Sequence, residues 1–275
     1  MSLHWKTLLP RYLLLALFML VVLIPLSGVV LSAFKTDIEV IRGPFSLPET
    51  WRLDNFIQAW QVGRFNIFFK NSAIVAVAVV IISVFLSILT GYAFGVLPLP
   101  GKKWLFPLIL LGYMVPLEAV IIPLYQFMDA LHLRDTIWAL ILPQIGLSVS
   151  FGTLWMTSFF ENAPQELIDA STIDGCSRWQ TLWLVLYPLS GPAVTTLIVL
   201  IFMWTWNEFL LALVLVQDEA LRTLPVGLAF FQGKYTANIP LLAAGALIVA
   251  LPTVLIYIFF QRSFIQGMLG GSVKG

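Results

Sequence analysis

The chain has 275 residues, of which 60% are hydrophobic and only 11% are charged. Soluble domains average nearer half apolar and a quarter charged, so this composition indicates an integral membrane protein. The formal net charge of +1 gives no indication of a nucleic-acid partner. Two histidines and one cysteine leave no disulfide and no Cys/His zinc site, so neither a metal nor a cofactor is expected.

Long apolar segments dominate the chain. A helix needs about 20 apolar residues to cross the hydrocarbon core, and only helices satisfy the backbone of such runs in lipid. The first run is interpreted as a retained span, because no clear cleavage site follows a short apolar stretch. The sequence therefore predicts an all-α integral membrane protein with one transmembrane domain, residues 1–275. Its six spans are expected at residues 12–34, 71–94, 104–126, 137–159, 188–211 and 241–260.

Residues 35–70 form the longest connection between spans. The turns Gly43-Pro44 and Leu47-Pro48 and several aromatic residues predict a small ordered lid at the membrane interface. Basic residues do not decide the orientation, because an inside N-terminus places seven of them inside and eight outside. The turn carrying Lys102 and Lys103 has no compensating acid, whereas the basic residues of 35–70 alternate with acids. This contrast favours an inside N-terminus.

The second span ends in Gly91 and Gly95, spaced for close helix packing against another helix or another subunit. The stretch from Gly95 to Lys103 superficially resembles a phosphate-binding loop. It has one residue too many and a lysine where Ser or Thr is required. The chain is therefore expected to lack a nucleotide site.

The third span carries Glu118, about two-thirds of the way across the membrane. A carboxylate there is costly against lipid, so it should face a cavity or a partner helix. Pro116 and Pro123 are expected to break the local helix. A role in a translocation path and a structural hydrogen bond to a partner subunit both remain open.

Residues 161–187 form a polar segment between two long uncharged runs. Pro164 suits the first position of a short helix, and Gly175 suits a left-handed cap at its end. Ser177 and Gln180 have the spacing of a capping box that begins a second helix. Two short amphipathic helices between spans indicate a docking surface for a soluble partner, and a plain interfacial loop is the alternative.

The fifth span ends in a cluster of aromatic and polar residues. Glu208 lies close to the far membrane face, where a carboxylate reaches water, and Asn207 is a candidate for a hydrogen bond within the core. Trp204, Trp206 and Phe209 could stack on a sugar. An aromatic belt at the membrane interface is the slightly favoured interpretation.

Three stretches carry a family resemblance. Asp169-Ala170-Ser171, Gly175 and the segment Val185–Pro188 resemble the cytoplasmic signature loop of binding-protein-dependent ABC importer permeases, with conservative departures at Asp169, Ser171, Val185 and Tyr187. The segments 204–210 and 223–228 and the tail 261–275 resemble carbohydrate-uptake permeases of the maltose-transporter type. Within that family the chain is similar to the shorter, six-span subunit.

The resemblance implies a transport subunit with no enzymatic activity of its own. Its implied partners are a second homologous permease, two copies of a cytoplasmic ATPase and an external solute-binding protein, with a carbohydrate as substrate. The implied location is the cell (inner) membrane, with both termini cytoplasmic. The predicted ATPase-docking residues are Glu166, Asp169, Ala170, Ser171, Asp174, Gly175 and Arg178, with Arg262 and Lys274 as a second contact; the candidate path residues are Glu118, Asn207 and Glu208.

Two other classes of protein are alternatives to this interpretation. A secondary active transporter of a small polar solute should show acids deep in several spans or broken helices in corresponding halves. A membrane enzyme should bring a convergent set of catalytic or metal-binding side chains into the spans. The sequence has one deep acid, Glu118, and no such set, so the importer permease is preferred.

Overall fold

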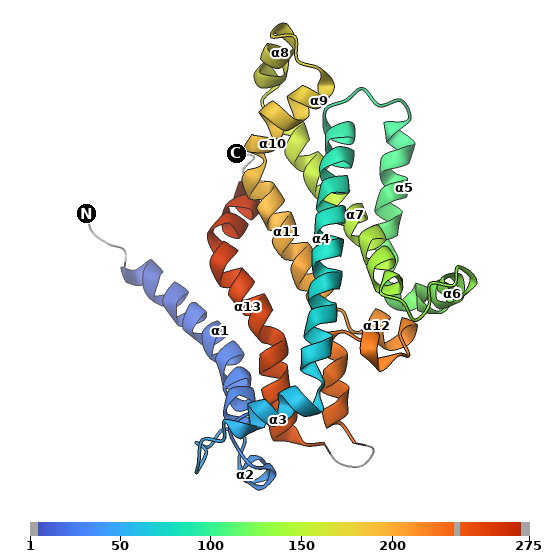
Figure 1. Ribbon diagram of the computed structural model, residues 1–275. Coiled ribbons are helices and arrows are strands. Elements are labelled where there is room, and N and C mark those ends of the chain that lie inside the picture. The colour runs from blue at the N-terminus through green and yellow to red at the C-terminus, as the bar shows by residue number, and fades with distance from the viewer. Residues whose placement is uncertain (1–4, 234–236, 271–275) are drawn as a thin grey trace. The chain divides into compact units, whose positions relative to one another are not determined.

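The computed structural model describes residues 5–233 and 237–270 (Figure 1). Within these residues the regular structure is helical, apart from an isolated antiparallel bridge between Gln232 and Ala237. Four helices are long and apolar enough to cross a membrane, and two bent pairs raise the number of candidate spans to as many as six. The predicted all-α membrane fold is confirmed. The described chain divides into two compact units, the first from 1–66 with 227–251 and the second from 67–226 with 252–275.

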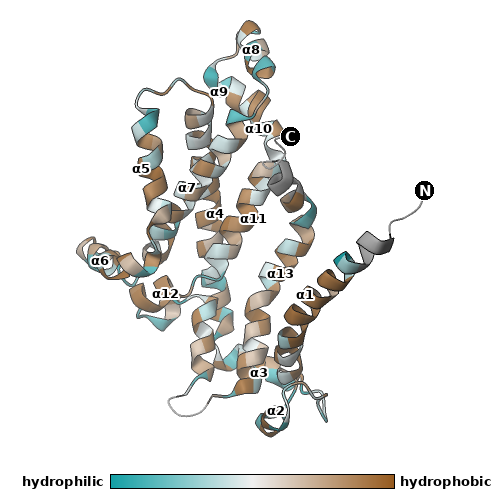
Figure 2. Ribbon diagram, turned by 180° about the vertical axis from the view of Figure 1, so that it is seen from behind, coloured by the Kyte–Doolittle hydropathy of each residue, from teal (hydrophilic) through white to brown (hydrophobic). Residues whose placement is uncertain are grey.

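The first unit contains the N-terminal span and the connection that follows it. Figure 2 shows α1 as an almost uniformly hydrophobic helix, and its side chains from residue 10 to 26 are exposed in the isolated chain, as expected of a surface that meets lipid or another subunit. The helices of this unit are α1 (Trp5–Ser32), α2 (Asp37–Arg42), α3 (Asp54–Val62) and the first part of α13 (Ile239–Gly270).

A buried lysine organises the connection between α1 and α3. Lys35 is fully buried, and its Nζ donates hydrogen bonds to the carbonyl oxygens of Gly43 at 2.8 Å and Pro44 at 3.1 Å. Asn55 Nδ2 donates to the carbonyl oxygens of Ala33 and Lys35, each at 2.9 Å. A buried charge is tolerated only when its donors are satisfied. The connection is therefore ordered, as the sequence predicted.

The start of α2 is fixed by a capping box. The Thr36 hydroxyl accepts a hydrogen bond from the backbone of Glu39, whose carboxylate accepts from the backbone of Thr36 at 2.7 Å and of Glu49 at 2.8 Å. These backbone donors stabilise the ionised carboxylate and lower the pKa of Glu39 from 4.5 to about 2.

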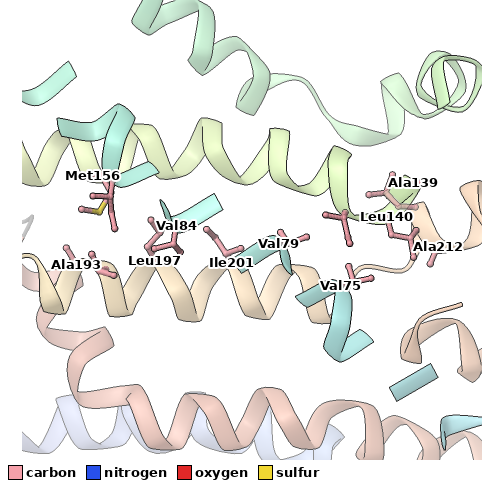
Figure 3. Close-up of a cluster of buried hydrophobic side chains, with 14 of the residues drawn as sticks. Val75, Val79, Val84, Ala139, Leu140, Met156, Ala193, Leu197, Ile201 and Ala212 are labelled. Atoms are coloured by element: carbon pink, nitrogen blue, oxygen red, sulfur yellow. The ribbon is translucent and has the colours of Figure 1, made fainter. Parts of the chain in front are cut away.

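The second unit holds the remaining helices. Its core lies between α4, α7 and α11, and Figure 3 shows Val79, Leu140 and Leu197 among the side chains that fill it. The elements are α4 (Phe65–Gly95), α5 (Lys102–Met114), α6 (Leu117–Ala130), α7 (Trp138–Glu161), α8 (Gln165–Ile173), α9 (Arg178–Gln180), the π-helix η1 (Thr181–Leu186), α10 (Tyr187–Leu189), α11 (Gly191–Trp206), α12 (Leu210–Leu215), the 3₁₀ helices η2 (Glu219–Leu221) and η3 (Leu224–Phe231) and the end of α13. Three of them cross the boundary between the units: α4 belongs to the second unit from residue 67, η3 up to residue 226 and α13 from residue 252.

The two spaced glycines of α4 pack within the chain. A Cβ atom on Gly91 would overlap the Met156 side chain of α7, and one on Gly95 would lie 2.8 Å from Cβ of Phe160. The hydroxyls of Thr90 and Thr153 are 2.7 Å apart across the same contact. The close packing predicted for Gly91 and Gly95 is therefore between α4 and α7.

Two predicted spans are bent. The helices α5 and α6 form an angle of 96° at Val115 and Pro116, so the predicted break at Pro116 is confirmed, whereas Pro123 lies inside α6 and does not break it. Proline disfavours the α conformation of the residue before it, and Val115 is accordingly extended, with φ −78° and ψ 119°. A second bend of 79° at Ser190 separates residues 178–189 from α11. The fifth span, predicted to begin at 188, therefore has its straight part in Gly191–Trp206.

Candidate functional sites: a capped polar loop and a cavity

The polar segment 161–187 forms two short helices joined by a tight corner. Helix α8 begins at Gln165, with Pro164 as its N-cap, one residue later than predicted. At the other end Gly175 has φ +79°, and its N–H donates to the Thr172 carbonyl at 3.1 Å, while Cys176 N–H donates to the Ser171 carbonyl at 2.9 Å. These two bonds form a Schellman motif, so the predicted left-handed glycine cap is confirmed.

The second helix begins at the predicted capping box. Ser177 Oγ accepts from the Gln180 backbone at 3.4 Å, and the Gln180 side chain accepts from the Ser177 backbone at 2.8 Å. The helix runs through α9, η1 and α10 to Leu189. Trp183 stacks between Phe85 of α4 and Trp179, at centroid distances of 6.2 and 6.5 Å. The aromatic stack anchors the second loop helix to a long span.

The inner side of the loop is held by buried hydrogen bonds. Ser171 is buried, and its hydroxyl donates to the Ile168 carbonyl at 2.7 Å. A serine hydroxyl has a single proton, so the Thr181 hydroxyl, 3.0 Å away, must donate to Ser171. Tyr92 of α4 donates to the Arg178 carbonyl at 3.1 Å. Ser171, predicted as a docking residue, therefore faces the second helix and fixes the angle between the two.

The outer side of the loop is exposed and acidic. Glu166, Asp169 and Asp174 are all exposed, and so are the apolar side chains of Leu167 and Ile173. Ile173 is 86% exposed at the tip, an unusual position for a large aliphatic side chain unless a partner covers it. The other predicted docking residues, Ala170, Gly175 and Arg178, are exposed as well. In Figure 2 the hydrophilic colours gather on α8 and α9, beyond the end of α11.

A salt bridge lies beside the start of the loop. Lys102 Nζ is 2.8 Å from Glu161 Oε1, which connects the α4–α5 turn to the end of α7. The expectation that this turn has no compensating acid is therefore wrong for Lys102, and only Lys103 remains to favour an inside N-terminus.

A cavity of about 590 Å³, lined by apolar and polar side chains, opens in the second unit, at the bend between α5 and α6 and the C-terminal end of α11. It brings together the three predicted path residues, Glu118, Asn207 and Glu208. Glu118 lies about 90 residues before Asn207 and Glu208 in the chain, so it is the fold that brings these side chains to one cavity. The cavity is lined by Tyr113, Val115, Pro116, Leu117, Glu118, Gln144, Leu147, Ser148, Leu200, Met203, Trp204, Thr205, Asn207 and Glu208.

Three further polar side chains that line the cavity were not predicted from the sequence. Gln144, Ser148 and Thr205 are each more than nine-tenths buried. Gln144 Nε2 donates to the Leu140 carbonyl at 2.8 Å, while the hydroxyls of Ser148 and Thr205 have no hydrogen-bond partner within the described residues. Buried hydroxyls are normally satisfied, so these two are available to a molecule in the cavity. The four-residue spacing of Gln144 and Ser148 in an apolar run was a signal for a polar stripe on α7.

The end of α11 is shaped by its own polar groups. Asn207 Nδ2 donates to the Met203 carbonyl at 2.7 Å, and Glu208 Oε1 accepts from the Leu211 N–H at 2.9 Å, at the start of α12. Trp206 is buried and packs on Phe69 and Phe202, so the interfacial belt predicted for it is wrong. Trp204, 45% exposed, lines the cavity.

Two predictions concern the C-terminal end and metals. Arg262, the predicted second contact, is exposed near the end of α13. Lys274 lies outside the described residues. No group of three or more His, Cys, Asp or Glu side chains suited to a metal ion occurs among the residues that the structure describes.

Comparison with known proteins places these features in a family. The family described as "Binding-protein-dependent transport system inner membrane component" matches residues 87–268, which include the loop, the cavity-lining helices and most of α13. The chain belongs to this family. It is thus a permease component of a binding-protein-dependent transport system, as the signature loop predicted, and the secondary-transporter alternative is not supported.

Similar proteins agree along nearly the whole chain. The probable ABC transporter permease protein YurM of Bacillus subtilis is 34% identical over 94% of this chain and 86% of its own length. The arabinooligosaccharides transport system permease protein AraQ of Halalkalibacterium halodurans is 35% identical over 91% of each chain. A chain of a bacterial ABC transporter involved in the import of the acidic polysaccharide alginate superposes with a TM-score of 0.80, at 21% identity, over 96% of this chain and 99% of its own. The last comparison shows a shared fold.

Proposed function

We propose that this chain is the membrane-spanning subunit of an ATP-driven importer of a carbohydrate. The full importer would contain a second homologous permease, two copies of a cytoplasmic ATPase and an external solute-binding protein. Membership of the permease family and 35% identity to an arabinooligosaccharide permease support this assignment. Residues 1–275 would form one permease domain in the cell membrane, with both termini in the cytoplasm.

The observation that carries the proposal is the construction of the 161–187 loop. Its inner side is held to α4 by the aromatic stack and the Tyr92 hydrogen bond, while its outer side presents acids and exposed aliphatic side chains. A rigid element whose outer face is acidic and apolar, with no salt bridge to these acids among the described residues, suits a partner with a basic, partly apolar cleft. We assign that cleft to the ATPase, which would contact Glu166, Asp169 and Asp174.

The geometry also connects the loop to the cavity. The second loop helix continues into α11 after the bend at Ser190, and the far end of α11 supplies Thr205 and Asn207 to the cavity. A movement of the docked loop would therefore be transmitted to the cavity by helix α11. The cavity, with Glu118, Asn207 and Glu208, would form part of the translocation path.

The test is transport by a variant that combines Glu166→Ala, Asp169→Ala and Asp174→Ala. We expect uptake of the carbohydrate to fall at least about tenfold and the ATPase to be lost on purification, because three charge contacts disappear from the docked face. The amount of the subunit in the membrane should be unchanged, since the three side chains are exposed.

A matched control removes the same charge elsewhere. Asp37→Ala, Glu49→Ala and Asp54→Ala alter three exposed acids of the first unit and should leave ATPase recovery unchanged. Normal uptake by the loop variant, or equal loss in the control, would show that the acidic face is not the docking surface. The second contact is tested by Arg262→Ala in the chain with an unchanged loop, where it should reduce ATPase recovery.

A further inference from the structure

The cavity between the α5–α6 bend and the end of α11 has an uneven distribution of charge. Two acids, Glu118 and Glu208, line it, and its other lining residues are uncharged. Neither acid forms a salt bridge within the described residues. Among the described residues, no basic side chain therefore offsets these two carboxylates.

The other lining groups suit a molecule rich in hydroxyl groups. The free hydroxyls of Ser148 and Thr205 both donate and accept, and the carboxylates accept. Trp204 and Tyr113 add flat apolar surfaces, and Phe151 holds them in place at centroid distances of 4.9 and 5.5 Å. The volume, about 590 Å³, is within the usual range of about 300–1,000 Å³ for small-molecule sites.

We propose that this cavity admits neutral carbohydrates and rejects anionic ones, with Glu118 and Glu208 as the residues that set this selectivity. The inference rests on the proposed carbohydrate transport and specifies its substrate class. The fold alone does not fix the charge of the cargo, because the alginate transporter of similar fold imports an acidic polysaccharide.

The size of the cavity sets the scale of the effect. A sphere of the same volume has a radius of about 5 Å, so an anionic group at its centre lies roughly 6 Å from each carboxylate. Even with the dielectric constant of bulk water, two unit charges at about 6 Å disfavour a third by about tenfold. Salt screening lowers this factor and a lower dielectric constant within the membrane raises it, so about tenfold is the expected scale of the effect.

The charge in the cavity can be measured with thiol reagents of opposite charge. Ser148→Cys places a thiol on the cavity wall, and Cys176→Ser removes the native thiol. The full-length chain is labelled in membranes that contain its importer, with a cationic trimethylammonioethyl and an anionic sulfonatoethyl methanethiosulfonate. The thiolate displaces methanesulfinate and forms a mixed disulfide, which mass spectrometry of this chain quantifies. Each rate is divided by the rate of the same reagent with a free thiol in solution.

We expect the normalised rate to be about tenfold higher for the cationic reagent. The additional changes Glu118→Gln and Glu208→Gln should bring the ratio close to one. The ratio cancels any change in the ionisation of the thiol itself, because both reagents need the same thiolate. A matched control, Glu49→Gln with Asp54→Asn, removes two exposed acids of the first unit and should leave the ratio high.

Three results would overturn the inference. They are equal normalised rates in the parent variant, a ratio that survives both glutamine substitutions, and a Ser148→Cys thiol that neither reagent reaches. Uptake of a radiolabelled neutral oligosaccharide by the unmodified importer separates this inference from the proposed function. Uptake with equal labelling rates refutes the selectivity alone, whereas a high labelling ratio with no uptake of any carbohydrate refutes the proposed substrate class and leaves the charge of the cavity established.

Discussion

The corner of the 161–187 loop depends on one residue, Gly175, and this dependence can be measured. Its φ of +79° lies in the left-handed region, and no atom lies within 4 Å of the position that a Cβ would occupy. Gly175→Ala therefore adds no steric clash with neighbouring groups, and its whole cost is backbone strain. That strain is about 1–2 kcal/mol for an L-residue in this region.

The strain should appear as faster opening of the corner. The amides of Gly175 and Cys176 are protected by their hydrogen bonds to Thr172 and Ser171. A loss of about 1–2 kcal/mol raises the open population about 5–30-fold, and hydrogen exchange of these two amides should accelerate by the same factor. Exchange is followed by mass spectrometry on the purified protein. Gly175→Asn should show a smaller acceleration, because asparagine adopts the left-handed conformation more readily than alanine.

A second glycine provides the control. Gly191, the first residue of α11, also has open space around its Cβ position, but its φ lies outside the left-handed range. Gly191→Ala should leave exchange at the corner unchanged. If Gly175→Ala did not accelerate exchange, or if both variants accelerated it equally, the strain argument would be refuted.

Three further predictions concern packing, buried hydrogen bonds and pH. Gly91→Ala forces a methyl group into Met156 and should destabilise the protein by about 1–3 kcal/mol, seen as a lower melting temperature in detergent, whereas Gly146→Ala, with open space around its Cβ, should not. Thr181→Val removes the donor to Ser171 and should cost about 0.5–1.5 kcal/mol; an unchanged melting temperature would contradict it. The pKa of Glu39 is lowered from 4.5 to about 2, so its stabilisation of the connection is present above about pH 4.5 and is lost as the pH falls towards 2. After correction for the intrinsic pH dependence of amide exchange, the protection of the Thr36 and Glu49 amides should fall over that range, and Glu39→Gln should abolish this change.

Structural features that depend on neighbouring residues could be predicted from the sequence. Apolar length predicted the helices around α4, α7 and α13, and capping chemistry predicted the Ser177–Gln180 start and the Gly175 corner. Each of these depends on a few neighbouring residues, so no knowledge of tertiary structure was needed.

Structural features that depend on packing between distant segments could not be predicted from the sequence. Pro116 signalled a break in the third span, but the direction of the chain after Val115 is decided by what α6 packs against. The inward orientation of Ser171 requires Thr181 opposite it, and the burial of Trp206 requires Phe69. The cavity itself depends on the meeting of α5, α7 and α11, which periodicity in one segment cannot reveal.

The bend at Ser190 has a mechanical consequence. Helix α11 is 16 residues long, which is about 24 Å at 1.5 Å per residue. It behaves as a lever whose short arm is the second loop helix and whose tip carries Thr205. A tilt of about 5° about the bend moves that tip by about 2 Å, enough to exchange one hydrogen-bonding partner for another in a cavity with a radius of about 5 Å. If the loop docks as proposed, a small rotation there would change which groups a molecule in the cavity can reach.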